Sequence, residues 1–222
     1  MLFEVCTPNY QSAKNAQEAG AHRIELCKEL DVGGLTPSLD LLKRVSGELS
    51  IKTFILIRPR AGDFVYNDQE FEEMKNDIKT CKELGFDGIV SGLLNPDNTI
   101  DLIRTRALVE LARPLEVTFH RAFDEVINPT EALEQLINLG VERVLTSGQK
   151  PKAEEGLSLL KTLKDKTQNK IIIVPGSGIN PKNASIFKEA GFKEIHASAS
   201  KEINGEITSD LNTIKAILDN LK

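Results

Sequence analysis

The sequence contains no tryptophan, and aromatic residues make up only 5% of its 222 positions. It has no apolar run near the roughly 18 residues of a membrane span, which argues against a transmembrane segment. The opening stretch MLFEVCTPNYQ lacks a basic region followed by an apolar one, so we expect no signal peptide. A basic excess is also missing, since 28 Lys and Arg stand against 33 Asp and Glu. The net charge of −5 argues against nucleic acid or an anionic membrane as partner.

Cysteine is scarce as well, with Cys6, Cys27 and Cys81 as the three present. An odd number without framework spacing predicts free thiols in a reducing compartment, so we expect a cytoplasmic protein. Methionine occurs only twice, which offers no thioether cluster for a soft metal. The remaining composition, 40% hydrophobic and 27% charged, is typical of a globular chain with a buried core.

A recurring pattern organises the chain. Four segments each combine the end of a helical pattern, a glycine and a short apolar strand; their glycines are Gly20, Gly85, Gly140 and Gly191. Glycine at such a position suits the left-handed residue that ends a helix. Four further strand candidates alternate with these segments, at residues 2–6, 51–58, 115–119 and 170–174.

Strands and helices therefore alternate eight times, which predicts parallel strands joined by helical crossovers. We expect one (β/α)₈ TIM barrel that forms a single domain over residues 1–222, with its last helix in the tail that follows Ser209. An open, doubly wound sheet is the alternative. Against it, no GxGxxG motif follows the first strand, and no linker marks a second domain.

Polar residues gather at the carboxyl ends of the predicted strands, where barrels of this class place their sites. The alternation of side chains predicts that Glu4 and Cys6 point into the barrel from the first strand. The same rule turns Arg23, Glu25 and Cys27 inward from the second strand. Two neighbouring strands thus share a Glu-x-Cys pattern, which packing alone does not explain.

Other strand ends add basic, histidine and small residues. The candidates from the third strand and its loop are Arg58, Arg60 and Asp63, and those near the fifth strand are His120, Arg121 and Asp124. The last three strands add Ser147, Gly148, Gly176, Gly178, His196 and Ser198. So many buried polar groups need partners and water, which predicts a polar funnel at this end of the barrel.

One hypothesis for this funnel is an enzyme that acts on a small anionic or phosphorylated metabolite. His120 or Glu25 would serve as general acid or base, with Asp124 orienting a partner. Glycines at strand ends allow backbone amides to approach a ligand. The anion would be bound by arginines and such amides, for which the candidates are Arg58, Arg60, Gly148, Gly176 and Gly178.

The same residues also have structural interpretations. Cys81 lies within a helical pattern and is expected to be a small buried hydrophobe, and Cys6 and Cys27 could be structural thiols too. Arg58 and Glu25 could form a buried ion pair, and the glycines could be turn residues only. A purely scaffolding barrel is therefore a further alternative.

The chain resembles the CutC family, a group named for copper homeostasis whose members are TIM barrels. The resemblance spans nearly the whole length and rests on segments 23–27, 33–38, 57–64, 118–124, 145–148 and 176–179. Arg-Pro-Arg and Thr-Phe-His-Arg-Ala are its most specific motifs. The chain departs from the family pattern at Ser91-Gly92-Leu93-Leu94 and at Val174-Pro175, changes that could reshape the pocket.

The resemblance implies a role in copper homeostasis in which Cys6 and Cys27 hold Cu(I), and it implies self-association, most simply as a dimer. Cu(I) is a soft ion that accepts two thiolates, and neighbouring strands lie only about 4.8 Å apart. The expected partner is therefore a copper ion or, under the enzyme hypothesis, a small anionic metabolite. The family name describes a process and no reaction. The arginines, histidines and glycines are therefore compatible with both the copper hypothesis and the enzyme hypothesis.

Overall fold

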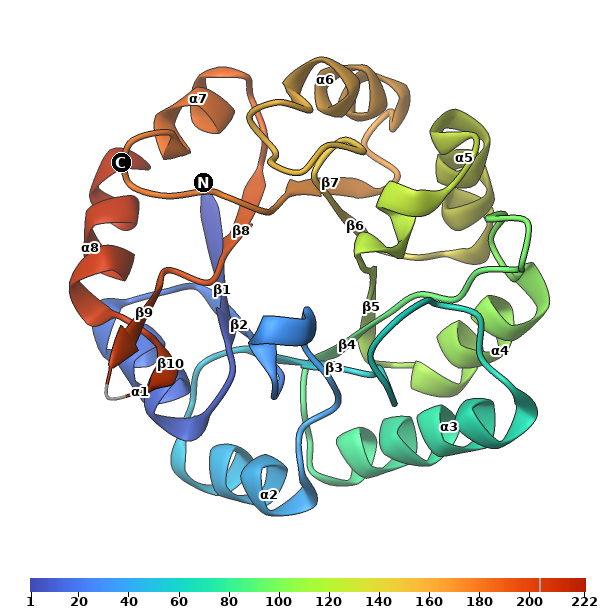
Figure 1. Cartoon of the computed structure of the whole chain (residues 1–222), viewed down its shortest axis with the longest axis horizontal. Helices are drawn as coiled ribbons and strands as arrows, with labels where there is room; N and C mark the ends of the chain where they lie inside the picture. Colours follow the sequence, from blue (N-terminus) through green and yellow to red (C-terminus); the bar gives the residue numbers. More distant parts are fainter. Residues whose placement is uncertain (204) are drawn as a thin grey trace.

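Eight parallel strands form the centre of the molecule, and the helices surround them (Figure 1). The computed structural model describes residues 1–203 and 205–222. The strands of the barrel are β1 (Leu2–Thr7), β2 (Arg23–Leu26), β3 (Thr53–Leu56), β4 (Gly88–Ser91), β5 (Glu116–Phe119), β6 (Arg143–Thr146), β7 (Ile172–Pro175) and β8 (Glu194–Ala197). Their order is β7-β6-β5-β4-β3-β2-β1-β8. The barrel is nearly closed, because β7 and β8 face each other across its seam. The predicted fold class is confirmed.

The surrounding helices follow the strands in turn. They are α1 (Tyr10–Ala19), α2 (Leu39–Glu48), α3 (Asp68–Glu83), α4 (Leu102–Ala112), α5 (Pro129–Leu139), α6 (Leu157–Lys166), α7 (Ala184–Glu189) and α8 (Leu211–Asn220). Gly20 and Gly140 end α1 and α5 in the left-handed conformation, with φ of 86° and 77°. This confirms the meaning assigned to these two repeated glycines, since a side chain at such a φ is strained.

Some local structure differs from the expectation. Two short 3₁₀ helices, η1 (Leu30–Val32) and η2 (Arg121–Glu125), follow β2 and β5. Strands β9 (Ser200–Ile203) and β10 (Glu206–Ser209) pair with each other before α8. The prediction of a helix directly after Ser209 omitted this pair, and Asp210 forms the N-cap of α8. The third strand is shorter than residues 51–58, because the amide of Arg58 donates to the Thr36 side chain instead of to a neighbouring strand.

Side chains alternate across the barrel wall as the sequence pattern predicts. Val5 and Ile24 are fully buried in the apolar layer beneath the helices. Glu4 and Arg23, one residue earlier on each strand, point inward, and the register places these two residues side by side on β1 and β2. Cys6 lies two residues further along β1, so its side chain occupies the next inward layer, nearer the carboxyl ends of the strands.

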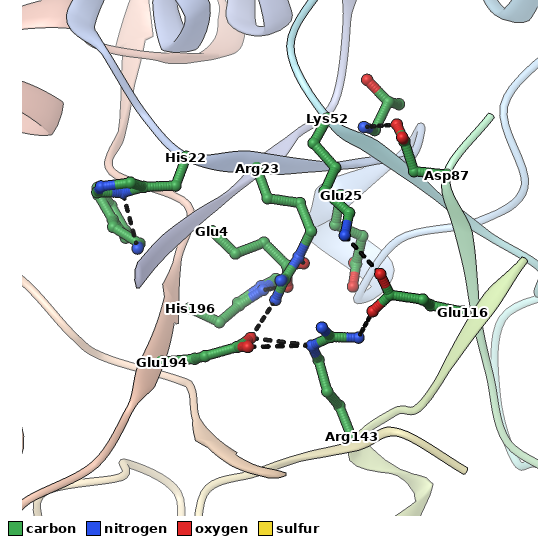
Figure 2. Close-up of polar contacts among 12 residues, drawn as sticks. Glu4, His22, Arg23, Glu25, Lys52, Asp87, Glu116, Arg143, Glu194 and His196 are labelled. Carbon is green, nitrogen blue, oxygen red and sulfur yellow. Dashed lines mark hydrogen bonds and ion pairs between the residues drawn. The ribbon is translucent and has the colours of Figure 1, made fainter. Parts of the chain in front are cut away.

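An ionic chain fills the lower part of the barrel (Figure 2). Its members are Glu4, Arg23, Glu194, Arg143, Glu116 and Lys52, each paired with the next. The Arg23–Glu194 and Arg143–Glu194 contacts measure 2.5 and 3.0 Å. The cations of Arg23, Lys52 and Arg143 lie 4.7, 5.4 and 5.3 Å from the centre of the Phe54 ring. The ionic chain and Phe54 thus form a floor beneath the carboxyl-terminal half of the barrel.

Candidate functional site

A cavity of about 580 Å³ opens at the carboxyl ends of the strands, directly above the ionic chain. Of the residues singled out from the sequence, Cys6, Glu25, Arg58, His120, Arg121, Asp124, Gly178, His196 and Ser198 line it. Its volume suits a small molecule or a metal ion with a small ligand. The remaining candidates, Glu4, Cys27, Arg60, Asp63, Ser147, Gly148 and Gly176, are not part of its lining.

The two thiols predicted as a pair lie together at the base of this cavity, where Cys6 is part of the lining and Cys27 contacts it without lining the cavity. The Sγ atoms of Cys6 and Cys27 are 3.6 Å apart, and both side chains are buried. Glu25 Oε1 lies 3.8 Å from the Cys6 thiol, which donates to it. One ring nitrogen of His196 completes a group with Cys6 and Glu25 in which all ligand atoms lie within 4.8 Å. We call Cys6, Cys27, Glu25 and His196 the thiol cluster.

The loop after β2 covers the thiol cluster. Leu30 in η1 packs against the apolar group that contains Cys6, Cys27 and Leu56. Gly34 makes this packing possible, because a Cβ there would lie 2.8 Å from Leu56 and 3.5 Å from the Cys27 sulfur. Gly34, which lies within segment 33–38 of the family resemblance, thus has a steric role beside the thiols.

His196 is held by Glu4, whose Oε1 lies 2.8 Å from its Nδ1 (Figure 2). Burial opposes charge on both groups. The attraction of Arg23 and His196 nevertheless lowers the pKa of Glu4 to about 2. Hydrogen bonds to Cys6 and Glu4, with the charge of Glu25, hold the pKa of His196 well above its ordinary value. Glu4 therefore influences the cavity through its hydrogen bond with His196, although Glu4 itself lies below the cavity.

Glu25 has the opposite character from Glu4. Burial, reinforced by the charge of Glu4, raises the pKa of Glu25 to about 7. Its Oε2 atom is buried and has no hydrogen-bond partner among the described residues. The hydrogen bond with Cys27, together with burial, raises the pKa of Cys6 well above that of an ordinary thiol. The base of the cavity therefore holds two groups that resist becoming anions unless a cation joins them.

His120 forms part of the opposite wall. Its Nδ1 accepts a hydrogen bond of 3.1 Å from the amide of Ala122. The ring packs against Phe64, with ring centres 4.8 Å apart. Gly92 leaves room for it, since a Cβ there would lie 2.6 Å from Nδ1. Burial and the charge of Arg58 lower the pKa of His120 to about 3, so the imidazole is neutral.

Arg58 links the loops that follow β2 and β3 through hydrogen bonds. Its guanidinium donates to the carbonyl oxygens of Val32, Gly34 and Gly62 at 2.9 to 3.0 Å and lies over Phe64. Its contacts in the described chain do not include the ion pair with Glu25 that the sequence left open. Arg60 turns away from the cavity and pairs with Asp63 and Glu70 at 2.8 and 2.6 Å.

Asp124 fixes the loop that follows β6. It accepts hydrogen bonds from the amides of Ser147 and Gln149 at 3.0 and 3.1 Å and from the Thr146 hydroxyl at 2.5 Å. It also pairs with Arg121 at 2.9 Å. These contacts tie Asp124 to the β6 loop.

The three candidate glycines have different surroundings. A Cβ on Gly148 would lie 2.5 Å from the carbonyl oxygen of Gly156, and one on Gly176 would lie 2.5 Å from Leu145. The amide of Gly176 is already bonded to Thr146. Gly178, in contrast, lines the cavity at a φ of 72°. Only Gly178 of the three is thus in a position to face a ligand in the described cavity.

Several cavity residues were not singled out as candidates. Six of them lie within segments that carry the family resemblance, which was the available signal: Gly33, Gly62, Phe64, Leu145, Ser177 and Ile179. Glu125 directly follows such a segment, and Ala197 lies between His196 and Ser198. Leu30, Val32 and Leu56 carried no signal, because nothing distinguishes them from core residues without the loop conformations.

The fold and the site define a TIM barrel with paired thiols, a histidine and a carboxyl group at the base of its cavity. The sequence model of the CutC family matches residues 1–201, and this chain belongs to that family. It is 50% identical over 199 residues to a mouse protein named copper homeostasis protein cutC homolog, covering 89% of this chain and 73% of the mouse protein. It is 49% identical to a CutC family protein of Proteus mirabilis, covering 90% and 80% of the two chains.

A solved structure agrees with this assignment. The crystal structure of the putative copper homeostasis protein CutC from Streptococcus agalactiae superposes with a TM-score of 0.84 at 34% identity, covering 89% of this chain and 98% of that one. Over the described residues, no helix combines the length and apolar character needed to cross a membrane.

Proposed function

We propose that this member of the copper homeostasis family binds Cu(I) directly, through Cys6 and Cys27, as a cytoplasmic copper-handling protein. The observation that carries the proposal is the 3.6 Å separation of two buried thiols on neighbouring strands. Cu(I) is soft and prefers thiolate ligands in low coordination numbers, so two thiolates supply much of what it requires. The copper ion is then cargo of the protein and not a resident cofactor.

His196 is the best candidate for a third ligand. Its Nδ1 is engaged by the Glu4 carboxylate, and its other ring nitrogen can bind a metal once it releases its proton, because the raised pKa of His196 keeps the metal-free ring protonated. A carboxylate behind a histidine is the usual support of a metal-binding imidazole, because it fixes the ring and its tautomer. Glu25 is a harder oxygen donor and suits Cu(I) less well than sulfur or imidazole.

The electrostatics of the base also favour a cation. Burial and the neighbouring thiol raise the pKa of Cys6, so without a metal this group keeps its proton. A bound cation offsets the cost of a buried thiolate, and binding releases protons. The site is therefore suited to a monovalent soft ion that is screened from water and external thiols.

Competition with a chromophoric Cu(I) chelator under anaerobic, reducing conditions tests the proposal. We expect Cys6→Ser/Cys27→Ser to weaken Cu(I) binding at least about 100-fold, since both soft ligands are lost. Cys81→Ser is the matched control, because Cys81 is also a buried thiol but lies in α3, outside the cavity. His196→Gln should weaken binding by about tenfold or more. Equal affinities for the wild type and the double variant would refute the proposal.

A further inference from the structure

His120 carries a donor that the protein itself does not use. Because its Nδ1 accepts from the amide of Ala122, the proton of the neutral ring sits on Nε2. That Nε2 is buried and has no acceptor among the described residues. A buried donor without a partner is unfavourable, and such groups are rare in folded proteins unless a ligand or water accepts from them. His120 is 5% exposed and belongs to the cavity wall.

Arg58 supplies a second such donor on the same wall. Its terminal nitrogens bond to loop carbonyls, but its Nε is buried and has no acceptor in the described chain. Arg58 and His120 both pack on Phe64, at 5.1 and 4.8 Å from its ring centre. A permanent positive charge and a neutral N–H donor are thus held together by one aromatic ring.

A third set of donors lines the same cavity, in the loop after β7. Ser177, Gly178 and Ile179 line the cavity, and the backbone amides of these residues have no acceptor within the described residues. Ser177 and Gly178 both have positive φ, 82° and 72°. Consecutive amides in such a turn form a concave group of donors that binds anionic oxygen atoms. The stem of Lys152 passes this turn, 3.0 Å from where a Gly178 side chain would begin.

Three acidic residues line the cavity, namely Glu25, Asp124 and Glu125, and of these Glu125 is exposed and forms no ion pair among the described residues. Asp124 is bonded to the β6 loop and to Arg121, so its charge is neutralised by donors of the protein. Glu25 belongs to the thiol cluster at the base. The cavity of about 580 Å³ also presents unused donors from the loops after β5 and β7, and its volume suits a molecule of metabolite size.

We propose that the upper cavity binds a small organic anion, a carboxylate or a phosphate ester, which accepts hydrogen bonds from the amides of residues 177–179 and from His120 Nε2. Arg58 supplies positive charge to the same ligand. This site is distinct from the proposed copper ligands, and it requires no metal. His120 acts in it as a hydrogen-bond donor to the ligand, with no role in the thiol cluster.

The test is a titration of the metal-free, reduced protein, followed by ¹H–¹⁵N NMR at constant ionic strength. The probes are inorganic phosphate in one arm and malonate, a small dicarboxylate, in the other. We expect at least one of them to shift the amide signals of residues 177–179 and the His120 Nε2–H signal saturably, with Kd near or below about 1 mM. Saturation by phosphate alone identifies a phosphate ester as the ligand class, and saturation by malonate alone a carboxylate.

Two variants make the assignment specific. His120→Asn keeps an acceptor for the Ala122 amide and removes the Nε2 donor, so it should weaken binding at least fivefold. His22→Asn is the control, because His22 is exposed and lies outside the cavity. If His120→Asn does not fold, the titration of the wild-type protein still tests whether the anion binds at residues 177–179. Absence of saturable shifts at residues 177–179 with both probes, or equal affinity in folded His120→Asn, would overturn the proposal, whatever the outcome for copper.

Discussion

Replacing Glu25 by Gln should make the metal-free protein more stable at neutral and alkaline pH. The folded-state pKa of Glu25 is raised from 4.5 to about 7 by burial, so the folded protein holds a proton that the unfolded chain releases. For such a raised acid, the free energy of unfolding falls as pH rises from 4.5 towards 7 and stays low above that. Glutamine carries no charge and avoids this loss.

The size of the effect follows from the shift. A change of one unit in pKa corresponds to about 1.4 kcal/mol, so Glu25 lowers the free energy of unfolding by roughly 3 kcal/mol at pH 8. Glutamine does not recover all of this free energy, because its NH₂ group must be buried at a position where Oε2 has no partner. We expect a net gain of about 1–3 kcal/mol at pH 8 and little gain at pH 4.5.

Urea unfolding of metal-free protein in the presence of a reductant, at pH 4.5 and pH 8, measures both values. Glu4→Gln is the matched comparison, because the pKa of Glu4 is lowered to about 2. Its contribution is present above pH 4.5 and is lost as pH falls towards 2, so Glu4→Gln should destabilise at pH 8. A Glu25→Gln protein that is no more stable than wild type at pH 8, or equally stabilised at both pH values, would refute the reasoning.

Further expectations concern the floor, the loops and the assembly. Glu194→Gln should cost about 3–5 kcal/mol in urea unfolding, because it leaves Arg23 and Arg143 incompletely paired in the barrel. Gly148→Ala should destabilise by more than Gly20→Ala, since both have positive φ but only Gly148 has a backbone oxygen 2.5 Å from the new Cβ; equal losses in thermal unfolding would contradict this. Asp124→Asn should increase hydrogen exchange at the amides of Ser147 and Gln149, while Cu(I) affinity in the chelator assay changes little. Sedimentation equilibrium should give a dimer, and a monomer over the whole concentration range would contradict that prediction.

The strand order was predictable because each unit has its own local signal. Repeated helix-ending glycines and alternating apolar residues are properties of short segments, and they need no knowledge of distant contacts. The inward orientation of Cys6 and Glu25 follows from the same alternation. The pairing of Cys6 with Cys27 needed only one further fact, namely that consecutive strands of a barrel are neighbours.

The floor and the walls of the cavity could not be predicted in the same way. Glu194 pairs with Arg23 across 171 positions of sequence, and a charged residue at the start of a strand is indistinguishable from a solvated one without the closed barrel. Arg58 was expected to bind an anion. The loop conformations instead bring three carbonyl oxygens to it, and such backbone geometry has no residue-type signal.

The closed floor of the barrel determines the route by which ligands enter and leave the cavity. Arg23 and Phe54 are fully buried and Glu194 nearly so, which leaves the cavity closed below. A metal at the thiols therefore enters and leaves by the upper mouth, past His120 and the turn at Gly178. If an anion occupies that upper level, the two ligands bind in a compulsory order: the metal arrives first, and the anion must depart before the metal can. The residence time of the metal is then limited by the rate at which the anion above it dissociates.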